Sequence, residues 1–63
     1  MDVRFKFASA QSASKANDEL GRYFSGNGYD YSYSDIHIII HGRCHNKDKA
    51  MAIVRSFGGE LEY

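Results

Sequence analysis

Apolar and charged residues alternate strictly at both ends of this chain, over residues 3–7 and 60–63. A period of two residues is typical of a strand with one buried face. The charged positions are basic in the first segment and acidic in the last, so antiparallel pairing makes favourable cross-strand pairs. We therefore expect the two ends of the chain to lie side by side. The apolar face should carry Phe5, Phe7, Leu61 and Tyr63, and the charged face Arg4, Lys6, Glu60 and Glu62.

Between these ends, apolar residues spaced three and four apart predict two helices, over residues 12–25 and 47–57. Side chains that cap helix N-termini and glycines that end helices flank both segments. The expected N-caps are Ser12, with Ser9 as a competitor, and Asn46, and the expected terminating glycines are Gly26 and Gly58. The expected buried stripes are Ala13, Ala16, Leu20 and Phe24 in the first helix and Ala50, Ile53, Val54 and Phe57 in the second.

The end strands are predicted at residues 2–8 and after Gly59. Two more strands are predicted between the helices, at residues 29–33 and 36–41. Residues 36–41 hold an isoleucine run, and β-branched side chains favour a strand over a helix. A two-residue turn at 34–35 joins the two middle strands into a hairpin. This turn places three tyrosines opposite three isoleucines, facing the helices, whereas a turn one residue longer reverses them toward solvent. We expect the inward register, which pairs Tyr29, Tyr31 and Tyr33 with Ile40, Ile38 and Ile36.

The resulting order is β-α-β-β-α-β in a single compact domain, residues 1–63. Right-handed crossovers then close an α+β two-layer sandwich, in which a four-stranded sheet of order 4-1-3-2 carries both helices on one face. This arrangement resembles the ferredoxin-like, or split βαβ, topology. The opposite face is left open. Strand parity places on that open face Arg4, Lys6, His37, Ile39, His41, Glu60 and Glu62.

Composition narrows the functional classes. Eight basic residues balance eight acidic residues, so the broadly basic surface of many nucleic-acid-binding domains is absent. No long apolar run is present to span a membrane, and charged residues near Met1 argue against a signal peptide. One cysteine cannot form an internal disulfide, which favours a reducing cytoplasmic location.

The segment from His37 to His45 contains three histidines and Cys44, which invites a metal or catalytic interpretation. On a strand, however, His37 and His41 lie ~13 Å apart, too far to share one tetrahedral ion. Adjacent residues such as Cys44 and His45 rarely face each other, and no oxyanion donor or orienting acid is evident for them. Cys44 precedes a helix N-terminus, which favours thiol reactivity but not catalysis. We therefore expect no metal, no cofactor and no enzymatic activity.

Two binding alternatives remain. The main expectation is a small protein-binding module, acting as a stoichiometric inhibitor or adaptor of a larger protein, through the open sheet face and the edge of the second strand. Compact neutral domains of this kind include host-directed proteins of viruses and mobile elements, and the edge also allows a homodimer instead of a monomer. The expected contact residues are Tyr29, Tyr31, Tyr33, His37, Ile39 and His41.

The alternative is a single-stranded nucleic-acid-binding domain that uses the same open face. Such domains stack bases on exposed aromatic side chains, so this alternative requires the outward tyrosine register. A separate anion site is a further alternative at the start of the second helix, where backbone N–H groups point outward. The expected nucleic-acid or anion contacts are Arg4, Lys6, Arg43 and Lys47.

Overall fold

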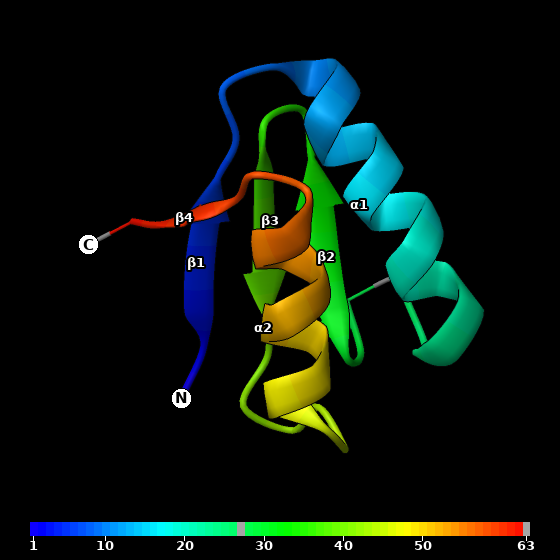
Figure 1. The fold of residues 1–63 in the computed structure, drawn as a ribbon. Helices are drawn as coiled ribbons and strands as arrows, with labels where there is room; N and C mark the ends of the chain where they lie inside the picture. The colour runs from blue at the N-terminus through cyan, green and yellow to red at the C-terminus, as the bar shows by residue number, and fades with distance from the viewer. Residues whose placement is uncertain (27, 63) are drawn as a thin grey trace.

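Six elements follow one another in the predicted order in the computed structural model, which describes residues 1–26 and 28–62 (Figure 1). The elements are β1 (Val3–Lys6), α1 (Ala10–Tyr23), β2 (Tyr31–Ser34), β3 (His37–Ile40), α2 (Lys47–Ser56) and β4 (Glu60–Leu61). The strands form one sheet of order β2-β3-β1-β4, with every neighbouring pair antiparallel. This is the predicted order 4-1-3-2 counted from the other edge. Both helices cover the same face, so the ferredoxin-like prediction is confirmed.

The predicted pairing of the chain ends is confirmed. Lys6 pairs with Glu60 and Phe5 with Leu61 across β1 and β4. The ladder continues past β4, because the Glu62 N–H donates to the Arg4 carbonyl at 2.8 Å. Opposite charges therefore meet across the strands, as the alternation predicted. The expected place of Tyr63 on the apolar face lies outside the described residues.

The hairpin between β2 and β3 turns one residue later than predicted. Ser34 pairs with His37, so the two-residue loop is Asp35-Ile36 and not Ser34-Asp35. Asp35 has φ = 53°, a left-handed conformation that aspartate tolerates better than most residues. The strand register consequently shifts by two residues. A shift of two keeps every side chain on its face, so the inward orientation of the β2 tyrosines is confirmed although their predicted partners were wrong.

The actual partners in the hairpin are Tyr31 with Ile40 and Tyr33 with Ile38. Tyr29, predicted to begin the strand, instead lies in the turn before it, where its N–H donates to the Gly26 carbonyl at 3.2 Å. The predicted strand limits of 29–33 and 36–41 were therefore wrong at both ends. β2 begins two residues later and ends one residue later than predicted, and β3 is one residue shorter at each end.

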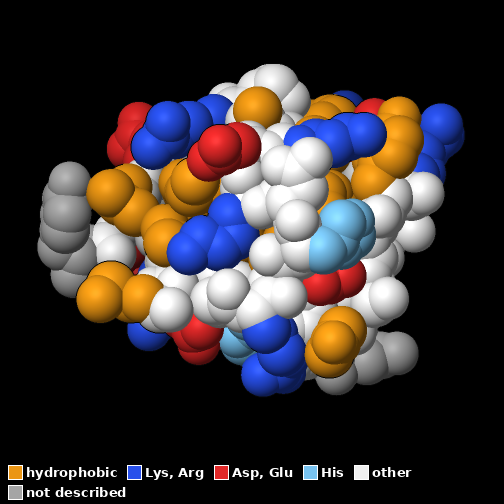
Figure 2. Space-filling view, turned by 90° about the horizontal axis from the view of Figure 1, so that it is seen from below, with side chains coloured by type: hydrophobic (Ala, Val, Ile, Leu, Met, Phe, Trp, Pro, Cys, Tyr) orange, Lys and Arg blue, Asp and Glu red, His pale blue; other side chains and the backbone are white. Residues whose placement is uncertain are grey.

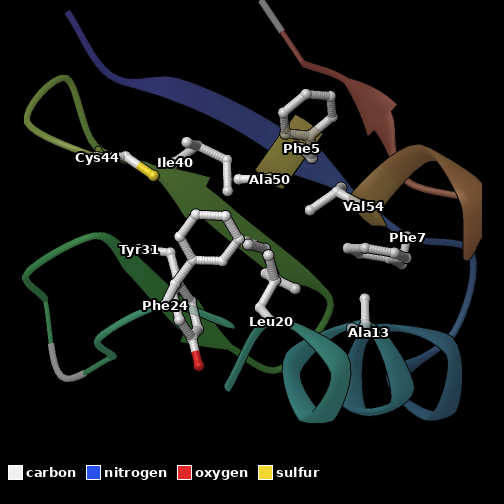
Figure 3. Close-up of a cluster of buried hydrophobic side chains, with 12 residues drawn as sticks. Phe5, Phe7, Ala13, Leu20, Phe24, Tyr31, Ile40, Cys44, Ala50 and Val54 are labelled. Atoms are coloured by element: carbon white, nitrogen blue, oxygen red, sulfur yellow. The ribbon is translucent and has the colours of Figure 1, made fainter. Parts of the chain in front are cut away.

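The core lies between the sheet and the two helices (Figure 3). Its largest fully buried side chains are Phe5, Phe7, Leu20, Ile38, Ile40 and Val54. Small residues bring the helices close to the sheet: Ala13, Ala16 and Ala50 are completely buried. The predicted stripes are confirmed at these alanines, at Leu20, Phe24 and Val54, whereas Ile53 and Phe57 are only partly buried.

The helix ends show which capping predictions were right. Asn46 caps α2 as predicted, because its side chain accepts the Lys49 N–H. In α1 the competing residue Ser9 is the N-cap: its backbone is extended, and its hydroxyl accepts the Ser12 N–H at 3.2 Å. Ser12 therefore lies inside the first turn. Gly58 has the positive φ expected after α2, whereas the positive φ after α1 belongs to Gly28 and not to Gly26.

Candidate functional site

The charges on the open face of the sheet are largely paired with one another. Arg4 Nε lies 2.9 Å from Glu62 Oε1, and His37 Nε2 lies 3.2 Å from the same oxygen. Lys6 stands directly opposite Glu60. Ile39 lies among them, half-buried, with Arg4 as its cross-strand neighbour. This face therefore presents a mixed, internally neutralised surface.

No tyrosine of the described strands stands on this open face. Tyr31 and Tyr33 share the face of Ile38 and Ile40, whose side chains are fully buried under the helices. The base-stacking platform that the nucleic-acid alternative requires is thus not formed by the described strands. Arg4 and Lys6, the basic contacts expected for that alternative, stand opposite acidic residues.

The outer edge of the sheet is formed by β2. Unlike the open face, this edge presents backbone N–H and C=O groups that point away from the sheet. Ser32 pairs with Ile39 and Ser34 with His37, and the pair that continues the ladder has the His41 N–H donating to the Asp30 carbonyl at 3.0 Å. In an antiparallel ladder the intervening residues direct their N–H and C=O groups to the other side. Tyr31 and Tyr33 therefore direct theirs to the outer edge. The Tyr31 carbonyl accepts the Gly28 N–H at 3.1 Å, which leaves Tyr33 at the centre of the accessible edge.

A groove of about 510 Å³ runs along this edge, between β2 and α1. Its lining residues are Asn17, Gly21, Phe24, Gly26, Gly28, Tyr31, Ser32 and Tyr33. Two of the glycines keep the groove open beside the Tyr31 hydroxyl. A Cβ atom at Gly26 would lie 3.2 Å from the Tyr31 oxygen, and one at Gly21 would lie 3.5 Å from it. Side chains at these positions would fill the space that the groove provides.

Tyr31 is the floor of the groove. Its ring lies beside Phe24 in the core, and its hydroxyl points out of the buried cluster (Figure 3). Burial raises the pKa of this hydroxyl above its usual range, and the Asp18 carboxylate adds to the effect. Tyr31 therefore stays neutral and able to donate a hydrogen bond. Tyr33 is 39% exposed and Tyr29 is 56% exposed, which leaves both rings accessible beside the groove.

At the end of β3, His41 is held between two partners from distant parts of the chain. Its Nε2 lies 2.7 Å from Ser32 Oγ, and its Nδ1 lies 3.1 Å from Asp2 Oδ2. The His41 side chain is only 14% exposed. Only a small part of the His41 ring is therefore accessible to a partner, although His41 was expected to be an exposed contact residue. Asp2 in turn accepts the Gly42 N–H at 2.9 Å, so three segments of the chain meet at this point.

The remaining candidate ligands point to separate partners. His45 Nδ1 lies 3.5 Å from Asp30 Oδ2, the same oxygen that accepts the Ser25 N–H. Cys44 is 8% exposed and belongs to the hydrophobic core, away from a reagent in solvent. Among the described residues, no group of three or more metal-ligating side chains comes together.

The two basic residues of the expected anion site, Arg43 and Lys47, lie in different surroundings. Arg43 donates to the Gly28 carbonyl and its guanidinium lies 5.2 Å from the centre of the Tyr29 ring. It therefore braces the loop before β2. Lys47 is the first residue of α2, directly after the Asn46 cap. The end of the molecule that carries these loops shows acidic, basic and histidine side chains interspersed, without a patch of one charge (Figure 2).

Comparison of the chain with protein-family models, with curated proteins and with solved structures gives no match. Over the residues described, neither helix has the length and apolar character needed to cross a lipid bilayer. The geometry of the chain itself therefore has to carry the functional argument.

Of the six predicted contact residues, the structure brings Tyr31 and Tyr33 together at the groove and leaves Tyr29 beside it. His37 and Ile39 lie on the open face, separate from the groove. Sequence reasoning missed the groove residues of α1, Asn17 and Gly21. Gly21 carried a detectable signal, because a glycine inside a helix is unfavourable unless its missing side chain is useful.

Proposed function

We propose that this chain is a protein-binding module that holds an extended segment of a larger protein along the edge of β2, and acts on it as an inhibitor or adaptor by occupying that segment. The observation that carries the proposal is the groove beside the outward-facing backbone of β2. An extended peptide can add to a sheet edge through main-chain hydrogen bonds, while pockets beside the edge select its alternate side chains. The outward-facing backbone of β2 and the groove beside it support such a mode of binding.

The backbone supports an addition of limited length. Tyr31 and Tyr33 direct their N–H groups outward, and the Tyr33 carbonyl is directed outward with them. The bond from Gly28 to the Tyr31 carbonyl ends the edge on one side. An added strand therefore makes few main-chain bonds, and side-chain contacts must supply most of the affinity.

The aromatic residues beside the groove are suited to that task. Tyrosine rings supply a large contact area with few rotatable bonds, and they are enriched among residues that dominate binding energy. Tyr33 stands at the centre of the edge, and Tyr29 extends the aromatic surface past its start. Apolar or small side chains of the incoming segment would lie against Tyr31 and Phe24.

Photo-crosslinking from within the groove tests the proposal. A benzophenone amino acid replaces Tyr33 in one variant and Tyr23 in a matched control, since Tyr23 is also exposed but lies against Lys49 of α2. In nuclease-treated lysate of the source cells, position 33 should crosslink a defined protein through a single extended segment, and position 23 should not. Equal crosslinking from both positions, or crosslinks to nucleic acid or to a second copy of the chain, would contradict the proposal.

The captured segment, made as a synthetic peptide, then provides a direct test. It should shift the amide resonances of Tyr31 and Tyr33 more than those of Arg4 and His37 on the open face. Replacing Tyr33→Pro, which removes one outward N–H together with the aromatic ring, should weaken its binding at least tenfold, whereas Tyr33→Phe, which keeps both, should leave it within about threefold.

A further inference from the structure

Ser32, His41 and Asp2 form one continuous chain of hydrogen-bonded side chains at the rim of the sheet. The distances are 2.7 Å from Ser32 Oγ to His41 Nε2 and 3.1 Å from His41 Nδ1 to Asp2 Oδ2. The other oxygen of Asp2 accepts the Gly42 N–H at 2.9 Å, which anchors the carboxylate to the loop after β3. A hydroxyl, an imidazole and a carboxylate are therefore connected in that order.

This order has a chemical consequence. A carboxylate that accepts a hydrogen bond from Nδ1 holds the imidazole in the tautomer whose Nε2 lone pair is available. In that tautomer Nε2 accepts the Ser32 O–H and can remove its proton when the oxygen attacks an electrophile. The small exposed fraction of His41, 14%, indicates a ring fixed in place and not one that samples solvent.

The environment keeps the carboxylate charged. The Gly42 N–H and the His41 side chain hold the pKa of Asp2 below its ordinary value of 3.8. Asp2 is consequently ionised at neutral pH. Its hydrogen bond to His41 then also stabilises the imidazolium that forms when the serine proton is taken.

We propose that Ser32 is a nucleophile toward activated carboxylic esters, with His41 as its general base and Asp2 as the residue that positions His41. Ser32 Oγ attacks the ester carbonyl carbon and forms a new C–O bond, while its proton passes to His41 Nε2. The bond to the leaving oxygen breaks, and the proton of His41 passes to the departing alcohol. Water, deprotonated by His41, then hydrolyses the acyl-serine and returns Ser32 to its starting state.

Space and a hydrogen-bond donor are available next to the hydroxyl. Ser32 is only half-buried, and strand parity places its hydroxyl on the open-face side of β2. A Cβ atom at Gly28, which lines the groove of about 510 Å³, would lie 3.8 Å from Ser32 Oγ, so the hydroxyl stands at the rim of that groove. The following residue, Tyr33, directs its N–H to the same outer edge. A backbone N–H directly after the nucleophile is one of the donors that stabilise the oxyanion in several serine hydrolases.

A serine-directed fluorophosphonate tests the nucleophile without any variant. The serine oxygen displaces fluoride from phosphorus and leaves a stable phosphonate ester. Mass spectrometry of the wild-type protein should locate this adduct on Ser32. No adduct, or an adduct confined to tyrosine, lysine or histidine side chains, would overturn the proposal.

The role of the base and of the carboxylate is tested by the release of nitrophenolate from p-nitrophenyl acetate. His41→Gln should lower the rate of serine acylation about 100-fold or more. His37→Gln is the matched control, because His37 also lies beside a carboxylate on the open face, and its rate should equal that of the wild type. Equal rates in the two variants would show ordinary imidazole reactivity and would also overturn the proposal.

Asp2→Asn should lower the acylation rate at least tenfold, because the amide no longer favours the reactive tautomer. Asp2→Glu, which restores the negative charge, should recover part of the rate. Circular dichroism of each variant verifies that the fold is kept. A rate unchanged by Asp2→Asn would refute the positioning role.

Discussion

The two edges of the sheet are built in opposite ways. β4 has two residues, and its partner strand β1 meets it with charges of opposite sign, as in the Arg4–Glu62 pair at 2.9 Å. β2 has four residues, Tyr31–Ser34, none of them charged. The hollow beside the β4 end, lined by Lys6, Phe7, Ala8, Gly58 and Glu60, measures about 300 Å³, against about 510 Å³ beside β2.

Under the proposed function, this difference separates stability from binding within a very small protein. Short strands and charged side chains are the usual means by which proteins protect a sheet edge from further pairing. The β4 edge uses both, and its pairing with β1 closes the chain. The β2 edge uses neither, and its outward backbone adjoins a groove. We therefore regard the β4 edge as structural and the β2 edge as the surface suited to a partner.

The largest expected effect concerns Gly59, whose backbone packs closely against the core directly before β4. A Cβ atom at Gly59 would lie 2.5 Å from Val54 Cγ1 and 2.9 Å from Phe7 Cζ, both in the core. Gly59→Ala should therefore lower the free energy of unfolding by about 3 kcal/mol or prevent folding. Gly58→Ala, which meets open space but requires a φ of 94°, should lower it by only about 1 kcal/mol. Urea denaturation measures both, and equal losses would contradict the close-approach argument.

The second effect distinguishes the two sides of the β2 backbone. Ser32→Pro removes an N–H that belongs to the ladder with β3 and leaves the facing carbonyl without its donor. Tyr33→Pro removes an N–H that points to the outer edge, where proline is tolerated. Ser32→Pro should consequently be less stable than Tyr33→Pro by about 2 kcal/mol. If thermal and urea unfolding rank the two variants the other way, the assignment of the outer edge is wrong.

A smaller effect is expected from the charges that close the sheet. Changing Glu60 and Glu62 together to lysine places like charges opposite Lys6 and Arg4. The free energy of unfolding should fall by about 1 kcal/mol at low ionic strength and by less in high salt. Glu19→Lys, at the exposed Arg22 pair of α1, serves as the control and should change stability by under about 0.5 kcal/mol. A double variant as stable as the wild type at low salt would remove the charge argument for β4.

The smallest effect is a dependence of stability on pH through Asp2. Because the pKa of Asp2 is lower in the folded protein than its ordinary value of 3.8, its contribution is present above that value. The contribution is lost as the pH falls through the folded pKa. The stability difference between wild type and Asp2→Asn should therefore be larger at neutral pH than in acid. A difference that grows in acid would contradict the sign, and carbon NMR of the Asp2 carboxyl measures the pKa directly.

The sequence alone predicted the topology because several local signals agreed. Alternating charges of opposite sign at the two ends indicated their pairing, and the spacing of apolar residues indicated two helices, which right-handed crossovers place on one face. It also predicted the inward tyrosines, although with the wrong partners. Side-chain direction in a strand depends only on parity, so an error of two residues in the turn left the faces intact.

The groove and the Ser32–His41–Asp2 arrangement could not be predicted in the same way. Both depend on where α1 ends and on where the hairpin turns, since these decide which residues lie opposite one another. Ser32 was predicted to lie in β2, but its contact with His41 exists only in the register set by the Asp35-Ile36 turn. Asp2 stood at the start of the first predicted strand, and the predicted order set that strand beside residues 36–41, but the register that brings Asp2 to His41 was not predicted.

Local patterning therefore determined the elements, their order, the buried faces and the pairing of the chain ends, because periodicity and charge act over neighbouring residues. Tertiary structure alone decided that a groove adjoins the β2 edge and which polar side chains meet at the end of β3. Those contacts join residues that are nine and 39 positions apart, and their distances depend on how the helices and the turn pack and not on the residues themselves.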